Sequence, residues 1–227
     1  MDVQSKITEM WDRVSEKYDT HTGHGMNTER EKAAWTDALR ALLPPPPADV
    51  LDVGTGTGVI ALLMANLGYS VRGIDLSEKM LAQASRKVSE GEAVVRFEIG
   101  DVMNPPGVRE SVDVVFNRHV IHMITNPARA LTSWFRLIRP GGRLVIIDGL
   151  WGQDPEDRIR DDIQAALPLR APDATTDDVL QLVEGAGFVD VTVSDIAEID
   201  RIERELAGED EPASNISRYV VTAQKPG

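Results

Sequence analysis

Apolar and polar positions follow two alternating periods along most of this chain. Between residues 48 and 147, short apolar runs rich in β-branched residues are separated by longer segments with apolar residues at helical spacing. The pattern predicts strands at residues 48–53, 70–74, 94–99, 112–116 and 143–147, and helices at residues 58–67, 77–88 and 126–138. Strands and helices that alternate in this way indicate crossover connections, so we expect a mainly parallel sheet covered by helices.

The first 47 residues carry helical patterns and no strand pattern. Residues 3–18 place apolar side chains on one face of a helix. A second helix is predicted from Thr28, because Thr28 and Glu31 have the spacing of a capping box. The prolines at residues 44–47 end this helix, since consecutive prolines cannot continue one.

The last third of the chain is more polar. Residues 151–174 are polar and contain prolines, with a candidate helix at residues 155–166. A helix is predicted at residues 176–184, and strands at residues 189–193 and 217–223. Between these two strands, the apolar residues from 196 to 206 match one face of a further helix among charged side chains.

Composition narrows the classes of partner. The chain has 24 Lys and Arg against 37 Asp and Glu, a net charge of −13 that repels phosphate backbones and anionic lipid. We therefore expect neither a nucleic-acid nor a membrane partner. The absence of cysteine excludes disulfides and thiolate zinc sites, and it fits a cytoplasmic location. No signal-peptide pattern is present, and the longest apolar run, residues 59–67, is too short to span a bilayer.

The strongest motif is a glycine-rich turn, VLDVGTGTG, at residues 50–58 between a predicted strand and a predicted helix. Glycines at this junction let the backbone turn sharply and approach a ligand closely. The turn is not the dinucleotide-binding fingerprint, which needs a glycine at position 59, where this chain has Val59. It is not a phosphate-binding P-loop either, because no Gly-Lys-Ser/Thr follows.

Acidic residues end the two strands that follow the glycine-rich turn. Asp75 ends one strand, about twenty residues beyond the first glycine, where a carboxylate can accept both ribose hydroxyls of a nucleoside. Asp101 follows the next strand. Because ligands of open α/β sheets bind outside the carboxyl ends of the strands, all three elements point to one crevice.

In combination, these residues resemble the class I S-adenosylmethionine-dependent methyltransferases. Asp52, Gly54, Gly56 and Gly58 match the first motif of that family. The strand VDVVFNRHVIH resembles its fourth motif, and FRLIRPGGRLVIID resembles its helix, Pro-Gly-Gly turn and fifth strand. The resemblance implies a Rossmann-like sheet with strand order 3-2-1-4-5-7-6, the last strand antiparallel. It also implies an N-terminal helical lid and proline linker at residues 1–47, a methyltransferase domain at residues 48–227, and a substrate-wall insertion at about residues 151–174.

The resemblance also implies the positions of the S-adenosylmethionine contacts. Asp75 matches the acid that binds the ribose, and Asp101 matches the acid that contacts the adenine amino group. Asp52 is expected to reach the methionine portion or to stabilise the loop. Tyr18 either contacts the cofactor's carboxylate or packs the first helix. The full set of expected cofactor contacts is Tyr18, Asp52, Gly54, Thr55, Gly56, Gly58, Asp75, Leu76, Asp101, Val102, Asn117 and Arg118.

All four histidines lie where this topology places the site. His119 and His122 follow the fourth strand, and either can act as a catalytic base because histidine titrates near neutral pH. We favour His122 slightly, because it aligns with a histidine frequent in this family. His21, His24 and Trp151 are expected on the substrate side. No carboxylate pattern accompanies the histidines, so we expect no metal.

The sequence leaves several functions open. The leading hypothesis is methyl transfer from S-adenosylmethionine to N or O of a small-molecule acceptor. The alternatives are a C-methyltransferase of a quinone-like ring and a non-catalytic S-adenosylmethionine-binding protein. A nicotinamide dehydrogenase is disfavoured by Val59. We expect a monomer or a homodimer.

Overall fold

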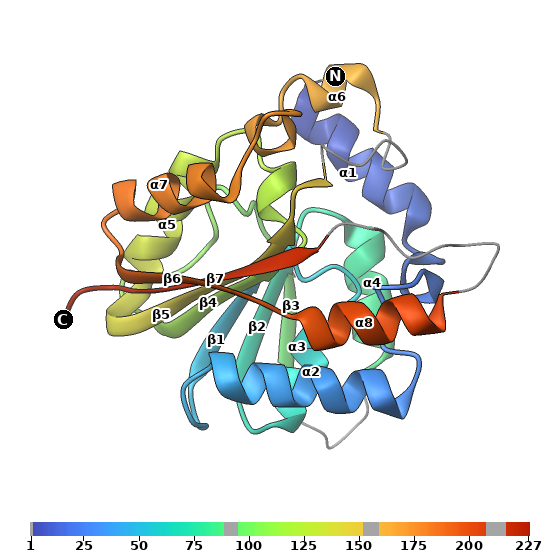
Figure 1. Cartoon of the computed structure of the whole chain (residues 1–227), viewed down its shortest axis with the longest axis horizontal. Coiled ribbons are helices and arrows are strands. Elements are labelled where there is room, and N and C mark those ends of the chain that lie inside the picture. Colours follow the sequence, from blue (N-terminus) through green and yellow to red (C-terminus); the bar gives the residue numbers. More distant parts are fainter. Residues whose placement is uncertain (1, 89–94, 152–158, 208–216) are drawn as a thin grey trace.

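A seven-stranded sheet forms the centre of the computed structural model, which describes residues 2–88, 95–151, 159–207 and 217–227 (Figure 1). The strand order is β3-β2-β1-β4-β5-β7-β6, which confirms the predicted fold class. Strands β1 to β5 pair in parallel, whereas β7 is antiparallel to both β5 and β6. The strands are β1 Asp49–Val53, β2 Ser70–Asp75, β3 Val95–Ile99, β4 Val112–Arg118, β5 Ile138–Gly149, β6 Val189–Asp195 and β7 Arg218–Gln224.

Helices cover both faces of the sheet and enclose a core on each (Figure 1). Successive side chains of a strand point to opposite faces, so Val114 packs with Trp35 on one face and Val115 packs with Trp134 on the other. Both tryptophans are fully buried. The helices packed along the sheet are α2 Glu29–Leu42, α3 Val59–Asn66, α4 Glu78–Arg86, α5 Pro127–Leu137, α7 Thr176–Gly185 and α8 Ala197–Leu206.

Helix α2 begins where the sequence predicts. The Thr28 hydroxyl accepts the N–H of Glu31, and the Glu31 carboxylate accepts the N–H of Thr28 at 2.8 Å, which is the predicted capping box. The helix ends at Leu42, before the prolines. Trp35 and Leu39 bury its apolar face in the core, so α2 is packed on the sheet.

The segment before α2 lies over the carboxyl edge of the sheet. α1 (Val3–Val14) rests against α4 and against α6 (Asp161–Gln164), as Figure 1 shows. The helix predicted at residues 3–18 is shorter in the structure. The Ser15 hydroxyl donates to the carbonyl of Asp12 at 3.0 Å, a local bond that competes with helical backbone pairing.

Strand β5 differs from its predicted form. Its first residue, Ile138, already pairs with Val112, and the Pro-Gly-Gly turn predicted at residues 140–142 is an irregularity within one long strand. At Gly142 a Cβ atom would lie 2.6 Å from the carbonyl oxygen of Asp113, so only glycine fits there. The sequence therefore predicts an interruption at the right residues, but in the structure they shift the register of pairing instead of separating a helix from a new strand.

The C-terminal third agrees with the sequence in its regular elements. α7, β6, α8 and β7 lie close to the predicted ranges. Of the candidate helix at residues 155–166, the structure describes only α6, and the preceding residues 152–158 lie outside the described part. Among the described residues, none of the helices has the length and apolar character needed to cross a bilayer.

Candidate functional site

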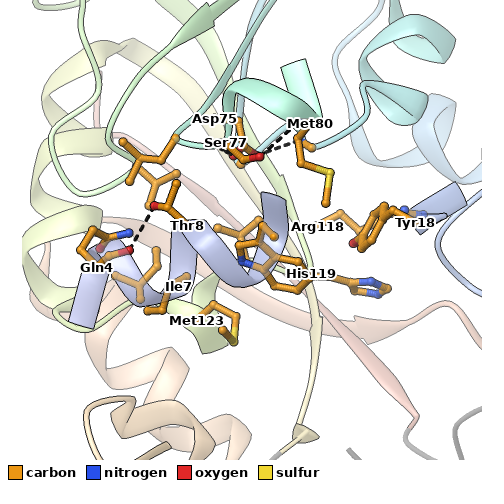
Figure 2. Close-up of a pocket in the computed structure, with 17 residues that line it drawn as sticks. Gln4, Ile7, Thr8, Tyr18, Asp75, Ser77, Met80, Arg118, His119 and Met123 are labelled. Carbon is orange, nitrogen blue, oxygen red and sulfur yellow. Dashed lines mark hydrogen bonds between the residues drawn. The ribbon is translucent and has the colours of Figure 1, made fainter. Parts of the chain in front are cut away.

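A cavity lies at the carboxyl edge of the sheet, beneath α1 (Figure 2). It has about 650 Å³ of space between the protein atoms, part of it open to solvent. Residues of the predicted cofactor set that line it are Tyr18, Gly54, Gly56, Asp75, Leu76, Val102 and Arg118, and the candidate base His119 lines it too. Helix α1 closes the opposite side with Gln4, Ile7, Thr8 and Trp11.

The glycine-rich turn leaves room for a ligand at one position. At Gly54 a Cβ atom would meet Val120 Cγ2 at 2.5 Å, and at Gly58 it would meet Phe97 Cζ at 2.6 Å. These two glycines are required by packing within the protein. At Gly56, which has a φ of +55°, a Cβ atom would find nothing within 4 Å. Because Gly56 lines the cavity, the open space beside it belongs to the cavity.

Asp75 connects the glycine-rich turn to the start of α4. Its carboxylate accepts the backbone N–H of Gly56 at 2.9 Å and that of Ser77 at 2.8 Å. Burial raises the pKa of Asp75, and the backbone hydrogen bonds oppose this shift. The carboxylate is thus held in one place on the cavity wall.

The two other predicted acids lie behind the cavity wall. Asp52 accepts the Thr55 hydroxyl at 2.6 Å, and burial raises the pKa of Asp52 to about 6. Asp101 accepts the N–H of Met103 at 2.9 Å. Neither is among the residues that line the cavity, so in this structure both side chains hold loops in shape.

At the end of β4, several buried polar atoms have no hydrogen-bond partner among the described residues. Asn117 is fully buried, and neither its amide nitrogen nor its amide oxygen has a hydrogen-bond partner among the described residues. The Arg118 guanidinium donates to the carbonyl of His24 at 2.7 Å and lies 5.0 Å from the centre of the Trp35 ring. Its other terminal nitrogen has no partner among the described residues. Unpaired buried donors are costly, so this edge is suited to an anionic or polar ligand.

Three predicted residues form a row of rings beside Arg118. Tyr18 stacks on His24 with ring centres 4.5 Å apart, and His24 meets the edge of His119 at 6.1 Å. Figure 2 shows Tyr18, Arg118 and His119 on the same side of the cavity. Burial lowers the pKa of His24 to about 3, and the nearby Arg118 adds to the shift. Burial and the same arginine also lower the pKa of His119, so both imidazoles are neutral at pH 7.

The substrate-side residues lie around this row. His21 meets His24 edge-on at 6.2 Å, and Trp151 meets His119 at 5.1 Å. The ring centre of His122 lies 5.8 Å from that of Trp151. The structure therefore places His119 on the cavity wall, whereas His122 is not among the residues that line the cavity.

The two candidate bases have different partners. His122 Nδ1 lies 2.7 Å from a carboxylate oxygen of Asp148. His119 Nε2 lies 3.5 Å from the Arg218 guanidinium. Because a guanidinium only donates hydrogen bonds, His119 Nε2 is the acceptor in this contact. Arg218 is itself paired with the buried Asp200 and Glu203. Among the described residues, a carboxylate partner is found for His122 and not for His119.

Sequence reasoning missed the contacts that hold the N-terminal segment on the site. The Ser77 hydroxyl donates to Asp12 of α1 at 2.5 Å. Asp19 accepts from both the Thr57 hydroxyl and the Lys87 ammonium, and Lys87 also donates to the Thr57 carbonyl at 2.8 Å. We call these contacts the two acidic latches, Asp12 and Asp19. The partners lie dozens of residues apart in the chain, so no local pattern signals them.

Comparison with known proteins gives a consistent set of matches. Residues 51–146 match a family model described as a methyltransferase domain. The chain is 30% identical over 153 residues to an arsenite methyltransferase of Halobacterium salinarum, covering 66% of this chain and 39% of that protein. It is 31% identical over 144 residues to a demethylmenaquinone methyltransferase of Thermotoga maritima, covering 61% and 59%. The chain thus matches less than two thirds of the length of these relatives.

The fold has counterparts among solved structures. Phosphoethanolamine N-methyltransferase 2 of Haemonchus contortus, in complex with S-adenosyl-L-methionine, superposes with a TM-score of 0.75 at 20% identity, covering 100% of this chain and 60% of that one. At this level of identity the likeness establishes the shared architecture.

Proposed function

Because the chain belongs to the class I S-adenosylmethionine-dependent methyltransferases, we propose that it transfers a methyl group from S-adenosylmethionine to nitrogen or oxygen of a small-molecule acceptor. The observation that carries this proposal is the cavity at the carboxyl edge of the sheet. It combines open space beside Gly56, the fixed carboxylate of Asp75 and the Arg118 nitrogen that has no partner among the described residues.

The residues present fit this cofactor. Asp75 would accept the ribose hydroxyls, and Gly56 would let the ligand lie against the backbone. Arg118 would pair its free N–H with the carboxylate of the methionine portion, and Asn117 would satisfy its amide on a neighbouring polar group. Leu76 and Val102 offer apolar contacts for the adenine. When bound, the cofactor supplies a methyl group on a positively charged sulfur.

The protein's own part in the reaction is alignment, exclusion of water and proton removal. Methyl transfer is an in-line displacement, so holding the acceptor atom opposite the methyl–sulfur bond supplies much of the acceleration. Helix α1 covers part of the cavity with Ile7 and Trp11, which would limit the access of water to a bound ligand. A histidine is useful when the acceptor arrives protonated, as an alcohol, a phenol or an ammonium does, and His122 is the candidate that we favour.

Carbon methylation of a quinone-like ring remains the second candidate. It is supported by the similarity to a demethylmenaquinone methyltransferase over 144 residues. This chemistry uses the same cofactor cavity and also requires loss of a proton from the acceptor. The two candidates therefore differ in the acceptor and not in the site.

Labelled S-adenosylmethionine tests the proposed function. The protein is incubated with methyl-labelled cofactor and separate pools of phenols, aliphatic alcohols, amines and quinols, and the products are identified by mass spectrometry. We expect label on oxygen or nitrogen. Label on a ring carbon would select the second candidate. Calorimetry provides an independent check, because tight binding of NAD without binding of S-adenosylhomocysteine would overturn the cofactor assignment.

Replacing Asp75 should weaken cofactor binding. In Asp75→Asn the side chain keeps its shape but loses the charge that strengthens hydrogen bonds from the ribose, each worth roughly 1.5–3 kcal/mol. We expect the affinity for S-adenosylhomocysteine to fall at least about tenfold by calorimetry. The affinity of Asp75→Ala should fall further, because the backbone N–H groups of Gly56 and Ser77 also lose the carboxylate that accepts their hydrogen bonds. A change within twofold in Asp75→Asn would place the ribose elsewhere.

We also propose that residues 1–28 act as a lid whose closure depends on pH. The pKa of His24 is about 3 in the closed arrangement, against an ordinary value of 6.5. Between these values an open segment binds a proton that the closed one does not, so acid favours opening. From pH 7.5 to 5.5 the open fraction should rise about tenfold, measured as proteolytic cleavage within this segment.

The matched control for the lid is His24→Phe. Phenylalanine keeps a ring against Tyr18 and keeps the backbone carbonyl that Arg118 binds, but it cannot take up a proton. Its cleavage should depend much less on pH. Bound S-adenosylhomocysteine should protect the segment in both proteins. Equal cleavage with and without this ligand would count against a lid.

A further inference from the structure

His119, which follows β4, combines an unusual backbone conformation with a polar atom that has no partner. Its φ is +58°, in the left-handed region that most side chains rarely adopt, and its backbone N–H donates to the carbonyl of Ile147 at 2.9 Å. The residue lines the cavity, and its Nδ1 atom is buried without a hydrogen-bond partner among the described residues. Backbone strain and unpaired buried polar atoms both cost stability, and such costs concentrate at sites that bind a ligand.

The contact of the other ring nitrogen determines where the hydrogen of the neutral imidazole lies. Nε2 accepts from Arg218, so Nδ1 is the nitrogen that carries the hydrogen. Arg218 is held in place by the buried carboxylates of Asp200 and Glu203. Burial and the charges of Arg118 and Arg218 lower the pKa of His119, so the ring stays neutral at pH 7. The Nδ1–H group is therefore a fixed donor that the protein leaves unused.

The remaining wall of the cavity is largely apolar. Among the described residues that line it, the charged side chains are Asp75 and Arg118, and the proposed function assigns both to the cofactor. Asp200 and Glu203 are not part of this wall. Ile7 of α1 packs in one apolar cluster with Met123, as Figure 2 shows. The apolar side chains beneath and within α1 are Ile7, Trp11, Val120, Met123 and Ile124.

We propose that His119 binds the methyl acceptor, its Nδ1–H donating to an oxygen of an acceptor that is otherwise apolar and carries no positive charge. This proposal rests on the proposed function, which leaves Asp75 and Arg118 to the cofactor. The oxygen belongs to a carboxylate, a carbonyl or a phenolate, each of which accepts hydrogen bonds. An ammonium group only donates, and beside His119 it would meet both a second donor and the positive charge of Arg118.

Nitrogen-15 NMR of histidine side chains tests the position of the hydrogen on the intact protein. The His119 signals are assigned by their loss in His119→Asn. At pH 8 we expect His119 in the Nδ1–H form. An Nε2–H form would overturn the proposal, and this result needs no acceptor.

A matched pair of probes tests the chemistry of the acceptor. Benzoate and benzylamine both carry an apolar ring, but one has a carboxylate and the other an ammonium group. In protein saturated with S-adenosylhomocysteine, benzoate should shift the His119 Nδ1 signal and benzylamine should not. Equal shifts, or no shift with either probe, would overturn the proposal. A shift by benzoate that disappears when S-adenosylhomocysteine is bound would assign the donor to the cofactor's carboxylate and overturn the acceptor assignment.

Two variants of His119 separate the donor from a structural role. Both His119→Leu and His119→Asn lose the acceptor of Arg218, but asparagine keeps an N–H donor near the place of Nδ1 and readily adopts a positive φ. In His119→Leu we expect KM for the acceptor found by labelling to rise at least about tenfold, with affinity for S-adenosylhomocysteine within about twofold. His119→Asn should restore KM to within about threefold. Circular dichroism checks that both variants are folded, and an equal rise of KM in both would overturn the proposal.

These results also distinguish failure of this proposal from failure of the proposed function. If benzoate shifts the His119 signal as expected but no pool of acceptors takes up label, the oxygen-binding site is supported and methyl transfer fails. If label appears on amines and benzoate causes no shift, methyl transfer is supported and the role of His119 is overturned.

Discussion

Gly56→Val should abolish cofactor binding while leaving the fold near native. The residue has a φ of +55°, which a β-branched side chain adopts at a cost of roughly 1–3 kcal/mol. The new methyl groups would also stand in the open space of the cavity, where the protein offers no contact within 4 Å of the Cβ atom. We expect affinity for S-adenosylhomocysteine to fall at least about 100-fold, measured by calorimetry.

Gly141→Val is the matched control for this experiment. Gly141 also has a positive φ, +77°, and a Cβ atom there would meet nothing within 4 Å, but the residue is not among those lining the cavity. The Gly141→Val variant should lose a similar amount of stability in thermal melting and keep its affinity for S-adenosylhomocysteine. Unchanged affinity in Gly56→Val would mean that the turn is structural only, and equal loss in both variants would assign the effect to strain.

His122→Ala should reduce turnover far more than cofactor affinity. A positioned base contributes about 10²–10⁴-fold, and His122 is the candidate with a carboxylate partner, at 2.7 Å. The side chain does not line the cavity, so binding of S-adenosylhomocysteine should stay within about twofold. Turnover is measured with the acceptor found by labelling.

His119→Ala is measured beside it. His119 lines the cavity, but its Nε2 faces Arg218, and burial lowers its pKa well below the ordinary value, which makes it a weak base. We expect a smaller loss of turnover, with a change in KM for the acceptor. A larger loss than in His122→Ala would transfer the role to His119. Full turnover in both variants would leave catalysis to alignment alone.

Most of the fold can be predicted from local patterns of apolar and polar residues. Alternation of apolar runs and helical segments determines the parallel part of the sheet, because each signal lies within ten or fifteen residues. Local patterns also predict where a helix begins, since the spacing of Thr28 and Glu31 alone predicts the start of α2. The Pro-Gly-Gly turn is a feature that local patterns do not fully predict. Whether such a turn terminates a strand or bends it depends on pairing with β4, which no local pattern contains.

The candidate site likewise contains residues that the sequence predicts and contacts that it does not. Gly54, Asp75 and Arg118 are found from sequence because the cavity lies at strand ends, whose order along the chain determines their place in space. The contact between His122 and Asp148 joins residues 26 apart, and the Asp12 latch joins residues 65 apart. Such pairings depend on how segments pack after the sheet has formed, so they become visible only in three dimensions.

The two acidic latches have a consequence for the order of events in a catalytic cycle. Asp12 binds the N-terminal segment to Ser77, which lines the cavity, and Asp19 binds it to Thr57 of the glycine-rich turn and to Lys87, just after α4. Opening of the segment over the cavity therefore requires these contacts to break. We expect the residence time of the spent cofactor, and not the chemical step, to set the pace of turnover, with the cofactor entering before the acceptor and leaving after the methylated product.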